Sequence, residues 1–151
     1  MFYNEYYESE EELAMPINPY LNFNGNCRDA VNFYADVFNH AAPDIMTFGD
    51  QPGPDGQPVP SEMANLVLHT RLSIHGSSLM FSDAMPDGPV TFGDNVTLAV
   101  VTDDLDAIHR EFEALSVNGR VLMPLQETFW SKAYGMLEDQ FGVQWQFSHE
   151  A

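Results

Sequence analysis

One histidine and one polar and aromatic segment carry the side chains best suited to binding or acid–base chemistry on a small molecule. His69 lies in a stretch of alternating residues, on the same face as Val67 and Arg71. Gln126 to Trp130 joins an amide, a carboxylate and a hydroxyl to two large aromatic rings, a mixture that small-molecule pockets use for orientation and contact area. Glu127 would be a general base there if burial removed its water. We therefore expect the following residues to line a pocket: His69, Arg71, Glu127, Phe129 and Trp130.

Each of these residues also has a purely structural interpretation. His69 could be hydrogen-bonded inside a sheet, although its place opposite Leu68 and Leu72 favours the face away from the helices. Phe129 and Trp130 could equally be core or dimer-interface residues. The remaining histidines lie near turns, within a helix or at the terminus, and we expect them on the surface: His40, His75, His109 and His149. No base is spaced from Ser77 or Ser78 as a hydrolase triad requires.

Periodicity predicts the elements that would position these groups in the first half of the chain. Ile17 to Asn24 alternates as a strand with one polar face, and Asn26 is expected to cap the helix that follows. The apolar side of this helix would consist of Ala30, Phe33, Tyr34, Val37 and Phe38. A short apolar segment at Ile45 to Phe48 precedes strands at Asn65 to Ile74 and Ser78 to Ser82, with a turn at His75 to Ser77.

The second half repeats this order. Asn95 to Thr102 predicts a strand, and Thr102 or Asp103 is expected to cap a helix that ends at Asn118 and Gly119. Its apolar side would consist of Leu105, Ile108, Phe112 and Leu115. Strands are then expected at Arg120 to Met123, Ala133 to Glu138 and Val143 to His149. The fold class is therefore α+β, with paired βαβββ modules that form curved mixed sheets around a cavity.

The length of 151 residues fits one domain, which we expect at residues 16–151 with halves at about 16–83 and 94–149. Residues 1–15 hold five glutamates and no lysine or arginine, so we expect an acidic flexible extension and no secretory signal. Cys27 is the single cysteine, which excludes a disulfide within the chain and a cysteine zinc cluster. A reducing, cytoplasmic location is therefore expected.

The charge balance narrows the range of partners. Asp and Glu number 23 against 5 Lys and Arg, a formal net charge of −18 that would repel phosphate backbones and anionic lipid headgroups. No apolar run is long enough to span a bilayer. We therefore expect neither nucleic acid nor membrane as a partner.

Several local strings resemble one protein family. They are Pro19 to Cys27, Phe33-Tyr34 with Val37-Phe38, Ser82 to Pro86, Gln126 to Trp130, and Asp139 to Trp145. Together with the repeated βαβββ order, they make the chain similar to the PhnB-like branch of the vicinal oxygen chelate superfamily, which includes glyoxalases, bleomycin-resistance proteins and dioxygenases. The resemblance implies a homodimer whose sheets curve around pockets. In its enzymatic relatives it also implies metal ligands that project from strands into each cavity.

The metal-ligand positions of the family correspond here to Asn18, His69 and Gln146. Only His69 is a strong ligand for a divalent metal, because neutral amides lack the charge that holds nickel, manganese or zinc. We therefore expect no cofactor and no tightly held metal, with a divalent metal at His69 as the alternative. Two amides and an imidazole are instead good donors and acceptors for an organic ligand. The three residues are expected to meet in one cavity, with Glu127, Phe129 and Trp130 nearby.

The function expected from this set is the binding of a small organic molecule in a dimer pocket. The alternative is a metal-dependent lyase, isomerase or dioxygenase of the superfamily. A phosphonate-related role is disfavoured, because Arg71 is the one cation near His69. PhnB-like sequences are often labelled as methyltransferases, but none of the glycines forms the Gly-x-Gly turn of a nucleotide-type methyl-donor site, so we reject that label.

Overall fold

The computed structural model describes residues 17–51 and 53–151, and the predicted acidic extension at Met1 to Met15 lies outside them. The chain divides into two compact units. The first unit runs to Ala35 and continues from His40 to Val90, and the second comprises Asp36–Asn39 and Thr91–Ala151.

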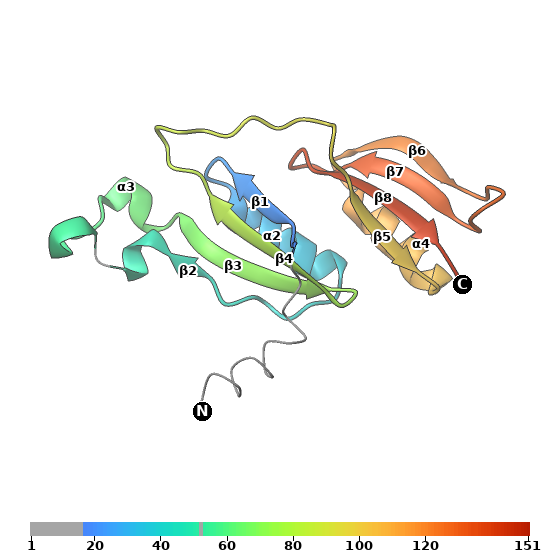
Figure 1. Cartoon of the computed structure of the whole chain (residues 1–151), viewed down its shortest axis with the longest axis horizontal. Helices are drawn as coiled ribbons and strands as arrows, with labels where there is room; N and C mark the ends of the chain where they lie inside the picture. Colours follow the sequence, from blue (N-terminus) through green and yellow to red (C-terminus); the bar gives the residue numbers. More distant parts are fainter. Residues whose placement is uncertain (1–16, 52) are drawn as a thin grey trace, which may run out of the picture. The chain divides into compact units, whose positions relative to one another are not determined.

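The first unit is a four-stranded mixed sheet with one long helix. Its elements are β1 (Tyr20–Phe23), α2 (Cys27–Val37, within this unit up to Ala35), β2 (Met46–Thr47), the 3-10 turns η1 (Phe48–Asp50) and η2 (Pro54–Gly56), α3 (Ser61–Ala64), β3 (Val67–Ile74) and β4 (Ser77–Asp83). The strand order is β1-β4-β3-β2, with β1 parallel to β4 and the other neighbours antiparallel. In Figure 1, α2 lies across one face of this sheet.

Aromatic rings fill the space between α2 and the first sheet. Tyr34 of α2 stacks on Phe81 of β4 with ring centroids 5.9 Å apart, and Phe81 also stacks on Phe23 of β1 at 6.5 Å. All three side chains are fully buried. Because burial of apolar surface is the main stabilising contribution to folding, this cluster holds the helix on the sheet.

A tight turn fixes the register of β3 and β4. His75 and Gly76 both have positive φ, 49° and 83°, as a type I′ hairpin turn requires. Ile74 therefore pairs with Ser77, and Arg71 with Met80. The turn predicted at His75 to Ser77 is confirmed.

The second unit repeats this arrangement. Its elements are β5 (Leu98–Thr102), α4 (Leu105–Leu115), β6 (Arg120–Gln126), β7 (Tyr134–Glu138) and β8 (Gln144–His149). The strand order is β5-β8-β7-β6, again with the first pair parallel. Phe112 of α4 packs edge-on against Phe147 of β8 at 5.6 Å. Gly135 of β7 leaves room for that ring, since a Cβ there would lie 3.0 Å from Phe112 Cε2.

The predicted α+β class and the strand, helix and three-strand order of each half are confirmed. Each unit forms its own open sheet. The predicted cap of the second helix is wrong. The cap is Asp104, whose carboxylate accepts the Ala107 N–H at 3.0 Å, while Thr102 Oγ1 accepts the N–H of Asp104. The helix also ends at Leu115, before Asn118 and Gly119.

In the first unit, Asn26 lies directly before α2, as predicted, and its carbonyl accepts the Ala30 N–H at 3.1 Å. The side chain that bonds to the N–H groups at this helix start is a distant carboxylate. Asp83 Oδ1 accepts the N–H groups of Gly25 and Cys27 at 2.9 and 3.0 Å, and Oδ2 accepts the Val67 N–H at 2.9 Å. Burial and the charge of Asp83 raise the pKa of the Cys27 thiol to about 12. Asp83 therefore joins the turn before α2 to the start of β3 and the end of β4.

Asp139 has the corresponding role in the second unit but acts over a shorter stretch. Its Oδ1 accepts the N–H groups of Phe141 and Val143 at 2.8 and 3.1 Å, and Oδ2 accepts Trp145 Nε1–H at 2.9 Å. It therefore closes the turn between β7 and β8 and orients the most deeply buried tryptophan.

Across the described ranges, none of the helices has both the length and the apolar character that a membrane span requires.

Candidate functional site

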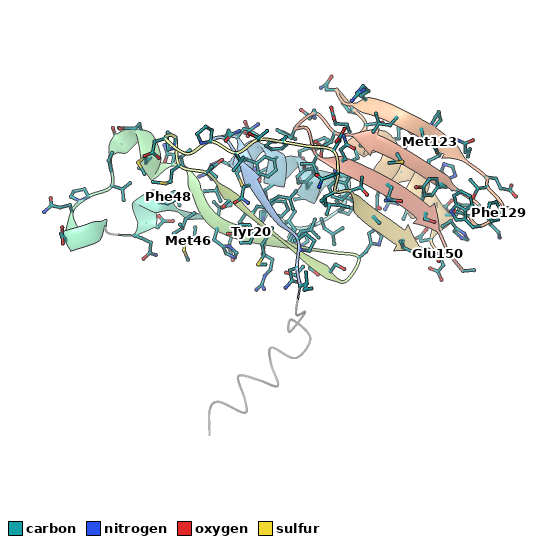
Figure 2. The ribbon with its side chains drawn as sticks, turned by 45° about the horizontal axis from the view of Figure 1, so that its top comes forward. Tyr20, Met46, Phe48, Met123, Phe129 and Glu150 are labelled. Atoms are coloured by element: carbon teal, nitrogen blue, oxygen red, sulfur yellow. The ribbon has the colours of Figure 1, made fainter. Side chains whose placement is uncertain are left out.

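The first sheet has one face covered by α2 and one open face. Along β3, Thr70, Leu72 and Ile74 are buried, whereas Arg71 and Ser73 are exposed. The strand register extends this open face across the sheet. We define the first open face as Tyr20, Asn22, Met46, His69, Arg71, Met80 and Ser82. Figure 2 labels Tyr20 beside β1 and Met46 beside β2.

The predicted alternation of β3 holds from His69 to Ile74 but is wrong for Val67. Val67 is completely buried, although it was expected to share the face of His69 and Arg71. The cause is a register shift, since Met46 pairs with His69 while the next residue, Thr47, pairs with Val67. Such an irregularity changes the side to which a strand residue points.

Tyr20 reaches across β4 to His69. Its hydroxyl lies 3.0 Å from His69 Nδ1, and the two rings are tilted with centroids 5.8 Å apart. On the same face, Ser82 donates to Asn22 Oδ1 at 3.0 Å. Arg71 is exposed and lies in one cross-strand row with Met80 of β4 and Tyr20 of β1. Asn18 is half-buried two residues before β1 begins.

The second sheet also has an open face, and its polar side chains hydrogen-bond to one another more than those of the first face do. Gln146 Oε1 accepts the Tyr134 hydroxyl at 2.8 Å, and Gln146 Nε2 donates to Thr97 Oγ1 at 2.7 Å. Gln144 likewise donates to Glu138 at 3.1 Å. The Gln146 amide therefore has its orientation set at both ends. We define the second open face as Thr97, Met123, Tyr134, Met136 and Gln146.

An aromatic row continues from Gln146 to a depression at one end of the second unit. The Trp130 ring packs edge-on against Tyr134 at 5.4 Å and against Phe129 at 4.7 Å. Phe129 is 97% exposed. The depression has a volume of about 430 Å³ and is lined by Glu127 to Lys132 and His149 to Ala151. Figure 2 shows Phe129 and Glu150 at the same end of this unit.

The burial of two ionisable side chains, His149 and Glu127, bears on the predictions made for them. His149 was expected on the surface but is buried, because β8 carries it beside Ser131, whose hydroxyl accepts the His149 backbone N–H at 3.0 Å. Glu127 is exposed, so its own unit does not provide the desolvation that a general base would need.

The predicted site residues are divided between the two units. The first holds Asn18, His69 and Arg71, and the second holds Glu127, Phe129, Trp130 and Gln146. Their meeting in one cavity therefore stays a prediction. The sequence reasoning missed Tyr20 and Tyr134 as partners of His69 and Gln146. Tyr20 alternates with Asn18 and Asn22, and this polar alternation was the available signal.

The donor set does not fit a tightly held divalent metal. Asn18 and Gln146 are neutral amides, and the Gln146 amide already bonds to Tyr134 and Thr97. His69 Nδ1 faces the Tyr20 hydroxyl. Within residues 17–51 and 53–151, no three or more His, Cys, Asp or Glu side chains lie together in a group that could hold a metal ion.

Comparison with known sequences gives one family. A family model described as 3-demethylubiquinone-9 3-methyltransferase matches residues 15–148. Protein YjdN of Escherichia coli K12 is 34% identical over 140 residues, which cover 87% of this chain and 92% of YjdN.

Comparison with solved structures agrees. Protein PA1353 from Pseudomonas aeruginosa has 35% identity and a TM-score of 0.77, over 89% of this chain and 96% of PA1353. The PhnB protein from Bacillus cereus has 28% identity and a TM-score of 0.68, over 89% and 98%. A glyoxalase/bleomycin resistance protein/dioxygenase family enzyme from Burkholderia phytofirmans has 15% identity and a TM-score of 0.54, over 86% and 95%, and shares the fold.

Proposed function

The chain belongs to the family described as 3-demethylubiquinone-9 3-methyltransferase and is a PhnB-like member of the vicinal oxygen chelate superfamily, and from this premise we propose that it binds a small organic molecule in the pocket of a homodimer. We place it in the cytoplasm, since its single thiol, Cys27, is buried and needs no oxidising compartment.

One observation carries the binding proposal. On each open face, a tyrosine hydroxyl is hydrogen-bonded to a residue predicted for the site, Tyr20 to His69 and Tyr134 to Gln146. Each pair lies beside flexible thioethers, Met80 on the first face and Met136 on the second. Oriented polar groups next to adaptable apolar surface are the usual composition of an organic ligand site.

A metal-dependent lyase, isomerase or dioxygenase is the alternative, and it would depend on His69. The poor fit of the donor set to a divalent metal supports binding over this chemistry.

Methyl transfer, which the family description mentions, finds little support in either sheet. A nucleotide-type methyl donor normally binds at a glycine-rich turn of a parallel sheet. Here each sheet contains one parallel pair, β1 with β4 or β5 with β8. We therefore do not propose this activity.

Exposed apolar side chains support the homodimer. Val121, Leu122 and Met123 on the edge strand β6 are each more than one third exposed. Several exposed apolar side chains on one edge strand often mark a protein interface. Light scattering at micromolar concentration should give twice the 17.0 kDa chain mass. A species of 17 kDa alone would contradict the dimer.

The binding proposal is tested by ligand-observed NMR with a library of small aromatic and aliphatic compounds. Compounds that bind the parent should bind His69→Ala about fivefold more weakly, since one hydrogen bond contributes roughly 1 kcal/mol. His109→Ala, on the exposed side of α4, is the matched control and should bind like the parent. A library without any binder, or binding that His69→Ala leaves unchanged, would contradict the proposal.

A further inference from the structure

The first open face holds one arrangement that the general binding proposal does not use. His69 and Arg71 lie two residues apart on β3 and on the same face, roughly 6.6 Å apart along the strand. Tyr20 and Met80 complete the row that contains Arg71. The hydrogen bond between Tyr20 and His69 engages Nδ1, which leaves Nε2 as the imidazole nitrogen that can face a ligand.

The Tyr20 hydroxyl and His69 Nδ1 lie 3.0 Å apart, and which of them donates depends on the imidazole tautomer. We assign the Tyr20 O–H as the donor, because the described residues offer it no other acceptor. In a neutral imidazole one nitrogen accepts and the other carries the proton. When Nδ1 accepts from Tyr20, the proton is on Nε2. Within the described part of the chain, His69 Nε2 has no hydrogen-bond partner, so in this tautomer its N–H can donate to a ligand.

Arg71 is a cation whose charge no described carboxylate balances. Acidic residues outnumber basic ones by 23 to 5, yet Arg71 is exposed and forms no ion pair with a carboxylate of residues 17–51 or 53–151. The ion pairs between described residues instead join Arg110 to Glu111 and Arg120 to Glu138. A guanidinium and an imidazole N–H on one face are well suited to a carboxylate, whose oxygens accept charge-assisted hydrogen bonds.

The rest of this face is apolar enough to hold a hydrocarbon body. Met80 lies between Tyr20 and Arg71 in the register, and Met46 pairs with His69. The Tyr20 ring is 44% exposed and available for contact. A single positive charge is matched by a single negative charge, so a monoanionic acid fits better than a phosphate in a chain this acidic.

We propose that Tyr20 is a positioning residue that holds His69 with its proton on Nε2, and that this N–H and the Arg71 guanidinium bind the carboxylate of a small aromatic or aliphatic acid. The assignment rests on the proposed function and specifies the ligand class for the His69 end of the site.

The positioning role is tested by ¹⁵N spectra of the histidine rings at a pH where they show His69 neutral. The parent should show His69 protonated at Nε2. Tyr20→Phe, which removes only the hydroxyl, should increase the population protonated at Nδ1. Tyr134→Phe makes the same change in the second unit and should leave His69 unaltered. An identical His69 spectrum in Tyr20→Phe and the parent would overturn the positioning role, and it needs no ligand to be measured.

The ligand class is tested with benzoate, its neutral isostere benzamide, and inorganic phosphate in NMR titrations. Benzoate should bind at least about tenfold more tightly than benzamide, since charge-assisted bonds are roughly twice as strong as neutral ones. Arg71→Gln should lose about tenfold in benzoate affinity and Tyr20→Phe about fivefold, while Arg110→Gln stays at the parent value.

Three outcomes would overturn the carboxylate assignment: benzamide binding as tightly as benzoate, phosphate binding more tightly, or Arg71→Gln binding benzoate like the parent. None of them would count against the proposed function, which fails only if no organic compound binds through the site. The two failures are therefore distinguishable.

Discussion

The two units have the same strand order but secure their helices differently. In the first, the N–H groups at the start of α2 bond to Asp83, which lies at the end of β4. In the second, α4 is capped by Asp104, the residue directly before it. The turn carboxylates differ in the same way, because Asp139 bonds within its own turn and to Trp145 six residues later. The first unit is thus joined by a long-range carboxylate and the second by local ones.

The open faces differ as well. In the second unit the polar groups satisfy one another, with Gln146 bonded at both ends. In the first, Arg71 is without a carboxylate partner among the described residues and His69 is bonded through Nδ1. The repeat therefore fixes topology, while the choice of side chains gives each half its own chemistry.

The largest expected effect concerns Asp83. Asp83→Asn would turn an amide N–H toward the buried Val67 N–H and weaken the bonds to Gly25 and Cys27. An unpaired buried donor and two weakened charge-assisted bonds should lower the free energy of unfolding by about 3 kcal/mol. Urea unfolding at pH 7 measures it. The control is Asp87→Asn, in an exposed turn, whose free energy of unfolding should stay within about 0.5 kcal/mol of the parent. If Asp87→Asn lost as much stability as Asp83→Asn, Asp83 would have no special role.

Asp139→Asn should cost less, about 2 kcal/mol in the same measurement. The amide would face Trp145 Nε1–H, but Phe141 and Val143 are half-buried and can bond to water instead. A loss larger than that of Asp83→Asn would reverse the distinction between long-range and local carboxylates.

Gln146→Glu tests the closed network of the second open face. A carboxylate can still accept from the hydroxyls of Tyr134 and Thr97, so the fold should persist. The added charge should raise affinity for nickel or manganese about tenfold, measured by calorimetry, since these ions prefer carboxylate over amide. The parent should come through chelator dialysis with its melting temperature unchanged. Stoichiometric metal in the dialysed parent would show that the amide set holds metal after all.

Cys27 gives a pH-dependent measure of the first unit. Its pKa is raised to about 12 in the folded chain from a usual value of 9.0, first by burial and then by Asp83. A raised pKa means that the folded state holds the proton more tightly. Its contribution to stability is therefore complete below pH 9 and decreases as the pH rises from 9 toward 12. The urea midpoint should fall less over this range in Cys27→Ala than in the parent, and parallel curves would contradict the assignment.

The smallest effect is expected for Phe129→Ser. This side chain is 97% exposed, so unfolding should change by less than about 0.5 kcal/mol. Phe147→Ser, its fully buried counterpart in the same unit, should be strongly destabilised. If Phe129→Ser lost as much stability as Phe147→Ser, the loop that holds Phe129 would have to be covered. Light scattering on the parent and on Phe129→Ser would then show whether a second copy of the chain covers it.

Elements that follow from short-range periodicity were predictable from the sequence. The alternation of Leu21 and Phe23, and the spacing of Ile108, Phe112 and Leu115, gave the right element types. The cap of α4 was missed because Thr102, Asp103 and Asp104 are all competent residues and geometry selects the last. The small helix α3 was missed because it consists of four residues directly after a Pro- and Gly-rich stretch.

Contacts that depend on strand register were not predictable. The use of Asp83 at the start of α2 requires β4 to lie beside β1, far away in the sequence. The pairing of Tyr20 with His69 requires both this parallel pair and the β3–β4 hairpin. For the site, residue types on alternating faces gave candidates, while their hydrogen-bond partners came only with the assembled sheet.

The parallel pairing of β1 with β4 has a kinetic consequence. The β3–β4 hairpin closes over a two-residue turn and can form early. The pairing of β1 with β4 joins segments about 60 residues apart in the sequence, so we expect it to form later. The same order applies to β5, which pairs with β8 only after the β7–β8 hairpin exists. We therefore expect the hairpin of each unit to form first and its first strand to be added last. In the refolding chain, amide protons of β3 and β4 should become protected before those of β1, although β1 leaves the ribosome first.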